Sequence, residues 1–170
     1  MLKLFYPNDD VSSTYRIDFA RLYEKGIRGV IFDIDNTLVP HGEPADEQAL
    51  ALFAHLRGLG MKTCLISNNK EPRVKPFAQA VGSIYVSDSH KPSVKNYRLA
   101  MERMGTNEGN TVFVGDQLFT DVFGANRAGI YSILVQPIHP KEEIQIVLKR
   151  YLERIVLYFY KRRKADVLWK

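Results

Sequence analysis

The chain has 170 residues, of which 45% are hydrophobic and 25% are charged. This length and composition fit one folded domain with its own core and exclude an intrinsically disordered chain. The net charge of +5 is unevenly spread, because residues 145–170 hold 8 basic and 2 acidic side chains while the preceding part holds 16 and 17. The single cysteine, Cys64, excludes a disulfide framework and indicates a reducing, cytoplasmic setting. No uncharged apolar run reaches about 18 residues, so we expect no membrane-spanning helix.

Short runs rich in apolar and β-branched residues recur along the chain, and they lack the strict alternation of half-exposed strands. We therefore predict five strands that are buried on both faces of a parallel sheet. They are residues 27–33, 61–67, 83–87, 111–116 and 131–136. Helix-like segments lie between them, at 44–60, 70–81, 92–105 and 120–129. This repeated alternation predicts an α/β fold with a single, doubly wound parallel sheet and right-handed crossovers.

Prolines mark the beginnings of two predicted helices. Pro44 and Pro92 are expected in the first turn, where a missing N–H costs nothing, and a glycine follows each helix. Pro76 weakens the prediction of a helix at 70–81, because it lies beyond the first turn.

Polar side chains follow the predicted strands at the edge where sheets of this kind bind ligands. Asp33 ends the first predicted strand, Ser67 the second and Asp116 the fourth. Lys91 lies in the loop after the third strand, just before its helix. Four crossovers therefore deliver one reactive side chain each to the same edge, which core packing does not explain.

Two of these side chains suit a hard divalent cation. Mg²⁺ prefers oxygen ligands, and Asp33 and Asp116 on neighbouring strands can supply two carboxylates. With the cation bound, Asp33 keeps an oxygen free to attack phosphorus and form an aspartyl-phosphate. The ammonium of Lys91, the hydroxyl of Ser67 and main-chain N–H groups after Asp33 can bind the phosphoryl oxygens, over which negative charge spreads.

Two further aspartates follow at short spacings. Asp35, two residues after Asp33, is predicted to act as general acid and base, protonating the leaving oxygen and later deprotonating the attacking water. Asp121, five residues after Asp116, is predicted to orient the waters of the metal or Lys91.

Simpler roles remain open for each of these residues. An aspartate after a strand can form a turn or cap a helix, a serine can belong to an ordinary loop, and a lysine can be a solvated surface cation. Their joint placement at one edge favours the catalytic interpretation.

Four motifs resemble, in order, those of haloacid dehalogenase (HAD) superfamily phosphatases: DIDNT at 33–37, ISN at 66–68, KP at 91–92 and GDQLFTD at 115–121. The resemblance implies that Asp33 is the nucleophile and Asp35 the acid and base. It further implies that Ser67 and Lys91 bind phosphate. Mg²⁺ would be held by Asp33, the main-chain carbonyl of Asp35 and Asp116. Dehalogenases lack the second aspartate of the first motif, so its presence here resembles phosphatases and mutases.

The spacing of the motifs leaves no room for a cap domain. Residues 38–43 separate the first motif from its helix, and residues 68–90 separate Ser67 from Lys91. Relatives that act on small metabolites usually carry a cap, so an open site favours a large or surface-bound substrate. The whole chain is similar to the YqeG-type, subfamily IIIA branch of the superfamily. Relatives of that branch include mitochondrial phosphatidylglycerophosphate phosphatases, which makes phosphatidylglycerophosphate a candidate substrate.

The chain is expected to divide into a HAD-like phosphatase core at 1–144 and a basic amphipathic C-terminal helix at 145–170. One apolar stripe of this helix is expected to pack on the domain or on a second copy, which would give a homo-oligomer. The stripe consists of Ile144, Val147, Leu148, Tyr151, Ile155, Tyr158 and Phe159. Apolar residues off the stripe and the basic KRRK at 161–164 also suit peripheral contact with an anionic membrane, and nucleic acid ranks last as a partner.

Together these features predict a Mg²⁺-dependent phosphomonoester hydrolase that acts through an aspartyl-phosphate, with a phospholipid head group as the leading substrate. The enzymatic alternative is a phosphatase of a phosphoprotein, nucleotide or sugar phosphate. An alternative of another class is a non-catalytic scaffold whose basic tail binds membrane, nucleic acid or ribosome-associated partners. The complete set of reactive side chains favours the enzyme.

Overall fold

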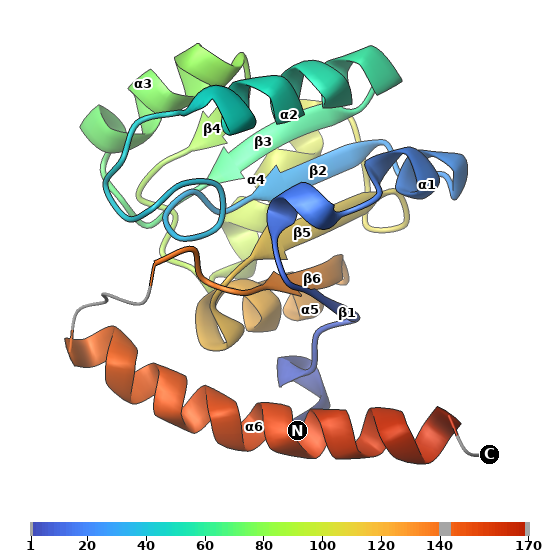
Figure 1. Cartoon of the computed structure of the whole chain (residues 1–170). Helices are drawn as coiled ribbons and strands as arrows, with labels where there is room; N and C mark the ends of the chain where they lie inside the picture. The colour runs from blue at the N-terminus through green and yellow to red at the C-terminus, as the bar shows by residue number, and fades with distance from the viewer. Residues whose placement is uncertain (1, 140–143, 169–170) are drawn as a thin grey trace.

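A computed structural model describes residues 2–139 and 144–168 and shows one sheet with helices on both faces (Figure 1). All strand pairs are parallel, in the order β1-β6-β5-β2-β3-β4. The strands are β1 Asp9–Val11, β2 Gly29–Phe32, β3 Lys62–Ile66, β4 Ile84–Val86, β5 Thr111–Gly115 and β6 Tyr131–Val135. The predicted fold class and the five predicted strands are confirmed. Strand β1 was not predicted, because its three residues include two aspartates and form no apolar run.

Helices pack on both faces of the sheet and bury a separate core on each (Figure 1). One face is covered by α1 Phe19–Glu24, α2 Glu47–Leu59 and α3 Glu71–Val81, and the other by α4 Val94–Met104 and α5 Phe123–Arg127. Shorter turns are η1 Leu2–Phe5, η2 Thr14–Arg16 and the π-helical η3 Leu118–Val122, which leads into α5. Along β2, Val30 and Phe32 join the first core and Ile31 joins the second. Burial on both sides explains why the sequence of β2 is a continuous apolar run.

The helices begin later than their prolines suggested. The carboxylate of Asp46 accepts a hydrogen bond from the N–H of Ala49 at 2.8 Å, so α2 begins after Pro44 and not at it. Pro92 likewise lies before the first residue of α4. The two predicted first-turn positions were therefore wrong. Helix α3 continues through Pro76, because four of its side chains are buried in the first core.

The register of the central strands sets the geometry of the edge at which they end. Phe32 of β2 pairs with Leu65 of β3 and with Val114 of β5. Asp33 follows at the same level, and its N–H donates to the carbonyl of Val114 at 3.0 Å. Residues that follow β2, β3 and β5 are thereby brought side by side.

The connections at this edge are short. Residues 33–46 join β2 to α2. Residues 67–93, between β3 and α4, hold only α3, β4 and short connections. Neither connection holds a further domain, so the prediction of a capless fold is confirmed.

Helix α6, Ile144–Leu168, runs along one side of the domain, and its first turns lie toward the edge at which the strands end (Figure 1). It contacts η3, and the ring centroids of Tyr160 and Tyr6 lie 5.6 Å apart. Within residues 2–139 and 144–168, no helix has the length and apolar character needed to cross a membrane.

The prediction gave the apolar stripe of α6 two alternatives, packing on the domain or on a second copy. The first is wrong for the side chains that are described, and the second stays a prediction. Four members of the stripe are between 48% and 65% exposed: Tyr151, Ile155, Tyr158 and Phe159. The side chains of the other three members lie outside the described residues. Glu153 and Tyr160 face the domain instead, at 5% and 8% exposure. Glu153 accepts a hydrogen bond from the N–H of Leu118, which holds this side of α6 against the domain.

Candidate active site

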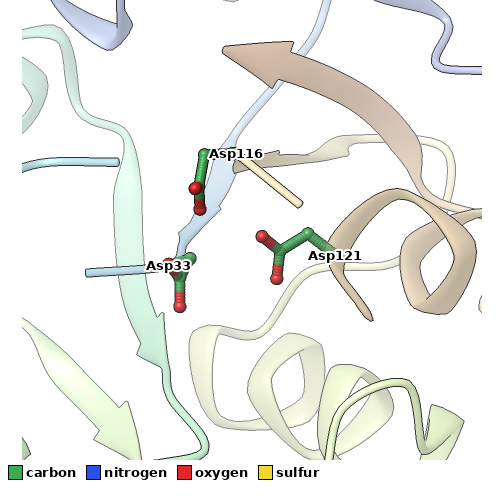
Figure 2. A group of neighbouring side chains, drawn as sticks. All are labelled: Asp33, Asp116 and Asp121. Carbon is green, nitrogen blue, oxygen red and sulfur yellow. The ribbon is translucent and has the colours of Figure 1, made fainter. Parts of the chain in front are cut away.

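Three carboxylates converge at the carboxyl edge of the sheet, where they point toward one another (Figure 2). Asp33 follows β2 directly, Asp116 follows β5, and Asp121 lies on η3. One oxygen from each lies within 4.8 Å of the others, and none of the three residues is more than 6% exposed. Asp33 and Asp116 thus meet where the sequence placed them. Asp121, expected in a supporting position, belongs to the cluster itself.

Burial of this much negative charge makes the carboxyl groups harder to ionise. Burial is the largest cause of the rise in the pKa of Asp33 to about 6; Asp121 adds to the rise and Lys91 opposes it. Burial, followed by the charges of Asp121 and Asp33, raises the pKa of Asp116 well above its usual value. A cation bound among these groups would favour their charged forms.

Lys91 supplies positive charge within the cluster. Its Nζ lies 2.5 Å from Oδ1 of Asp33 and 2.7 Å from Oδ1 of Asp121. Burial acts to lower the pKa of Lys91, but the carboxylates of Asp121 and Asp33 outweigh it and raise the pKa, so the ammonium stays charged. Asn68 fixes the loop, because its Oδ1 accepts hydrogen bonds from the N–H of Lys91 at 2.7 Å and from Oγ of Ser89 at 3.0 Å.

Thr37, the last residue of the DIDNT motif, lies between two of the carboxylates. Its Oγ1 is 3.3 Å from Oδ2 of Asp33 and 3.2 Å from Oδ1 of Asp116. A hydroxyl has one proton to donate, so it serves one carboxylate at a time. Asp33 is thus contacted by Lys91 on one oxygen and by Thr37 on the other.

A glycine at position 115 allows Asp121 to reach the cluster. A Cβ on Gly115 would lie 2.5 Å from Oδ2 of Asp121, closer than side chains approach one another. The same Oδ2 accepts a hydrogen bond from the N–H of Gln117 at 3.0 Å. The space left by Gly115 and the hydrogen bond from the turn that follows it therefore both position the carboxylate of Asp121.

Asp35 is held by donors from three segments of the chain. Its Oδ2 accepts a hydrogen bond from Nδ2 of Asn69 at 2.6 Å. Its Oδ1 accepts from Nη2 of Arg73 at 2.9 Å and from the N–H of Gly42 at 2.8 Å. Asn36 has a φ of 62°, a left-handed conformation that asparagine tolerates, so the backbone turns sharply after Asp35. The carboxyl group is thus fixed close in sequence to Asp33.

Ser67 follows β3 directly and is 2% exposed. Its Oγ accepts a hydrogen bond from the N–H of Asn69 at 3.1 Å. The side chains of Asn68 and Asn69 bind Lys91 and Asp35, respectively. The segment after β3 therefore joins the predicted phosphate-binding lysine to the predicted acid and base.

Two residues of α6 that the sequence did not indicate also reach the site. The guanidinium of Arg150 donates to Oδ2 and to the main-chain oxygen of Asp116. Glu153 accepts a hydrogen bond from the N–H of Leu118 at 2.8 Å and lies 3.1 Å from Nη1 of Arg150. Their spacing places both on one side of a helix, but no pattern in the sequence points that side at Asp116.

The other residues that contact the site differ in how far the sequence indicates them. Thr37 lies inside the first motif and Asn69 directly follows the second, so both were visible as neighbours of motif residues. Arg73 gave no signal, because it meets Asp35 only when α3 has folded beside the loop after β2.

The donor set fits a hard divalent cation. Three buried carboxylates offer only oxygen atoms, which are the ligands that Mg²⁺ and similar ions prefer. Lys91 balances part of their negative charge, and Arg150 is shared with Glu153. A divalent ion would offset the charge that remains.

The sequence is similar to a known protein over almost its whole length. It is 34% identical to "Probable phosphatase YqeG" of Bacillus subtilis over 169 residues, which cover 99% of this chain and 98% of that protein. A family model of haloacid dehalogenase-like hydrolases matches residues 44–129. The chain belongs to this hydrolase family. The family and the enzyme class predicted from the motifs, a HAD phosphatase, are confirmed.

Two other relatives in this family have a more specific name. The chain is 27% identical to "Phosphatidylglycerophosphate phosphatase 1, chloroplastic/mitochondrial" of Arabidopsis thaliana, over 92% of this chain and 47% of that protein. It is 29% identical to "Phosphatidylglycerophosphate phosphatase 1, chloroplastic" of Chlamydomonas reinhardtii, over 81% of this chain and 55% of that protein. The chain thus spans about half the length of these two relatives.

Solved structures of HAD proteins share the fold. A subfamily III A hydrolase from Legionella pneumophila superposes with a TM-score of 0.53 at 16% identity, covering 88% of this chain and 93% of that one. The cobalt-bound deoxy-D-mannose-octulosonate 8-phosphate phosphatase of Haemophilus influenzae gives 0.52 at 13% identity, covering 81% and 91%. At these identities the likeness shows the fold alone, which agrees with the doubly wound sheet.

Proposed function

We propose that this HAD enzyme is a Mg²⁺-dependent phosphomonoester hydrolase that acts through an aspartyl-phosphate on Asp33. The observation that carries the proposal is the buried cluster in which Asp33 shares Lys91 with Asp121 and lies beside Asp116. Phosphoryl transfer needs positioning and neutralisation of charge more than covalent chemistry from the protein. A carboxylate held among one ammonium and two further carboxylates meets that need once a cation is added.

Mg²⁺ would be held by the carboxylates of Asp33 and Asp116, with the main-chain carbonyl of Asp35 as the third protein ligand that the family resemblance implies. When bound, the ion supplies positive charge that neutralises phosphoryl oxygens. Arg150 binds Oδ2 of Asp116, while Oδ1 lies beside the hydroxyl of Thr37. Asp116 would therefore offer the cation one oxygen, Oδ1.

In the first half of the reaction, a carboxylate oxygen of Asp33 attacks the phosphorus of the ester. The bond from phosphorus to Asp33 forms as the bond to the leaving oxygen breaks, and Asp35 gives that oxygen a proton, so an alcohol departs. The ammonium of Lys91 and the hydroxyl of Ser67 stabilise the phosphoryl oxygens during this transfer.

In the second half, Asp35 as a carboxylate takes a proton from a water molecule, whose oxygen attacks the phosphorus. The bond between phosphorus and Asp33 breaks, inorganic phosphate leaves, and Asp33 is again a free carboxylate. Asn69, Arg73 and the N–H of Gly42 hold Asp35 in place. A fixed position suits a group that gives and then recovers a proton at the same site.

The proposed substrate is phosphatidylglycerophosphate. Support comes from the Arabidopsis and Chlamydomonas relatives, which are named for this activity and match 92% and 81% of this chain. The capless architecture adds support, because the short connections 33–46 and 67–70 leave the site accessible to a head group that projects from a surface.

Hydrolysis of a panel of phosphate esters, with and without Mg²⁺, tests the proposal. The panel contains a generic aryl phosphate, phosphatidylglycerophosphate in mixed micelles, a phosphopeptide, a nucleotide and a sugar phosphate. We expect Mg²⁺-dependent release of phosphate, with the highest kcat/KM for phosphatidylglycerophosphate. Asp33→Asn is expected to lower kcat at least about 1,000-fold, because it removes the nucleophile. Acid-quenched wild-type protein should carry phosphate on the peptide that contains Asp33.

Asp88→Asn is the matched control, because it makes the same change at a loop carboxylate that is 42% exposed. It should leave the rate unchanged. Equal rates for the wild type and Asp33→Asn would overturn the proposed mechanism. Activity toward the other esters but not toward the lipid would reject the substrate and keep the phosphatase, whereas inactivity toward every ester would favour the scaffold alternative.

A further inference from the structure

We infer that helix α6 is the element by which this enzyme docks on an anionic lipid surface, and that the outer side of the helix makes the contact. The inference deepens the proposed function and rests on it for its purpose. Two observations support it. One side of α6 binds the edge of the sheet that holds the active site, and the other side exposes large apolar side chains.

Contacts with the domain define the inner side of α6. Arg150 binds Asp116, Glu153 accepts a hydrogen bond from the loop after β5, and Tyr160 packs beside Tyr6. Residues spaced by three and by seven lie along one side of a helix. The helix is therefore fixed in its rotation over the stretch from Arg150 to Tyr160.

The opposite side of α6 exposes large apolar side chains. Their exposed fractions are 65% for Tyr151, 49% for Leu152, 48% for Ile155, 59% for Tyr158 and 51% for Phe159. Spacings of three, four and seven residues group them on one side. Within the described residues, half of the large apolar side chains that are exposed belong to this helix. Such a concentration is typical of a surface that is covered by a partner.

The exposed charges on this part of α6 are all positive. Arg154, Lys161 and Arg162 are exposed, whereas Glu153 is buried against the domain. Basic groups beside aromatic and aliphatic side chains fit an anionic bilayer, where the cations meet head groups and the apolar groups enter the interface. A twofold contact with a second copy would bring the same cations to the interface from both copies, and this part of the helix exposes no acidic side chain to pair with them. The lipid surface is therefore the better partner.

Docking through this side would bring the lipid beside the active site. Helix α6 begins near the edge at which the strands end, and Arg150 in its early turns contacts Asp116 (Figure 1). A helix that lies flat on the surface therefore holds the Asp33 cluster on its inner side, one helix diameter (~10 Å) from the head groups.

Co-sedimentation of the full chain with vesicles tests the inference. Vesicles of phosphatidylcholine are compared with vesicles that also contain phosphatidylserine, which is not a phosphomonoester. We expect binding to the anionic vesicles, weakened by added salt. Replacing the outer apolar groups, or the exposed basic groups of α6, should lower the affinity at least about tenfold. The apolar variant carries Tyr151→Gln, Ile155→Gln and Phe159→Gln, and the charge variant carries Arg154→Gln, Lys161→Gln and Arg162→Gln.

Matched controls make the same kinds of change at exposed positions elsewhere. They are Leu50→Gln with Ile84→Gln, and Lys95→Gln with Arg98→Gln. These controls should bind vesicles as the wild type does, and the control, apolar and charge variants should all hydrolyse a soluble aryl phosphate at the wild-type rate. Asp33→Asn should bind vesicles normally, so a failure of docking is distinguishable from a failure of the phosphatase proposal.

Wild-type protein that stays in the supernatant with anionic vesicles would overturn the inference, and so would an equal loss of binding in the outer-side and control variants. Dimerisation that the apolar variant abolishes, without vesicle binding, would assign the surface to a second copy. Binding of RNA without binding of vesicles, lost in the charge variant alone, would assign it to nucleic acid. Either result also rejects the lipid surface.

Discussion

The carboxyl edge of the sheet and the outer side of α6 depart from the usual distribution of side chains in opposite directions. At the edge, Asp33, Lys91, Asp116 and Asp121 are at most 8% exposed, although charged residues are seldom buried. On α6, five large apolar or aromatic side chains are between 48% and 65% exposed. Both arrangements are unfavourable for the chain in water alone. This is why we propose that a cation and a phosphate join the first region and a lipid surface the second.

Arg150 and Glu153 connect the two regions, since they lie on α6 and bind the loop that carries Asp116. The two regions should nevertheless respond differently to mutation. Removing a partner from a buried charge leaves that charge uncompensated, whereas trimming an exposed apolar side chain removes few contacts. Mutations in the two regions therefore test whether the contrast between them is real.

Lys91→Met should have the largest effect on stability. It removes the ammonium that lies 2.5 Å from Asp33 and 2.7 Å from Asp121, so two buried carboxylates lose their common partner. We expect the metal-free protein to lose about 3–5 kcal/mol of unfolding free energy, measured by denaturant titration. The control is Lys70→Met, which breaks a solvent-exposed pair with Asp88 and should change little. Similar losses in both variants would contradict the special role of the buried cluster.

Arg150→Met should have the next largest effect, and Mg²⁺ should reverse much of it. The substitution leaves the buried carboxylate of Asp116 without its guanidinium partner, at a cost of about 2–3 kcal/mol without metal. A bound cation would replace the lost positive charge, so Mg²⁺ should raise Tm more in this variant than in the wild type. Arg150→Lys, which keeps the charge but loses the paired donors, should lie between them. A smaller rise with Mg²⁺ in Arg150→Met would contradict this account.

Metal affinity should depend on pH through the same carboxyl groups. Burial raises the pKa of Asp33 to about 6 and that of Asp116 well above its usual value, so both take up protons as the pH falls. Mg²⁺ needs the deprotonated forms, and its affinity should fall up to about tenfold per pH unit below about 6 for each proton displaced. Calorimetric titrations in buffers of different ionisation enthalpy would count the protons released. An affinity that is flat across this range would reject these ligands.

The same shifts predict how the stability of the metal-free protein varies. A carboxyl group whose pKa is raised on folding costs stability once it must ionise, so the free energy of unfolding should decrease as the pH rises from about 4 through about 6. Added Mg²⁺ should remove this decrease. Thermal melts with and without the ion would show it.

The outer side of α6 should give the smallest effect. Phe159→Ala should change the free energy of unfolding by less than about 0.5 kcal/mol, because the side chain is 51% exposed. Tyr160→Ala, its neighbour on the inner side, is 8% exposed beside Tyr6 and should cost about 1–3 kcal/mol. Equal losses at the two positions would mean that the rotation of α6 differs from that described.

The site residues at the strand ends were predictable because their placement follows from the sheet. An apolar run identifies a buried strand, and parallel pairing brings the residues after each strand to one edge. Phe32 pairs with Val114, so Asp33 and Asp116 had to be neighbours once both strands were recognised. The pair of Asp33 and Asp116 thus required only local patterns and one general rule, whereas Asp121 lies on η3 and was expected only in a supporting position.

The orientation of α6 was not predictable in the same way. Its periodicity predicts a stripe, and the usual expectation is that the more apolar side faces the domain. Here the polar contacts of Arg150 and Glu153 with the loop after β5 fix the inner side, and Tyr151, Ile155 and Phe159 face outward. These contacts join residues that lie 34 and 35 positions apart. Local patterns carry no signal over that separation.

Strand β1 has a consequence for the order of folding during synthesis. It leaves the ribosome before the other strands of the sheet, yet its partner is β6, and Asn8 beside it exchanges hydrogen bonds with Ser132, 124 residues later. The nascent chain must therefore carry β1 without its partner while the rest of the sheet emerges. Two aspartates in a strand of three residues discourage stray pairing with other chains in that interval. This edge of the sheet can therefore close only after β6 has been synthesised, however strong the pairing of the two strands is.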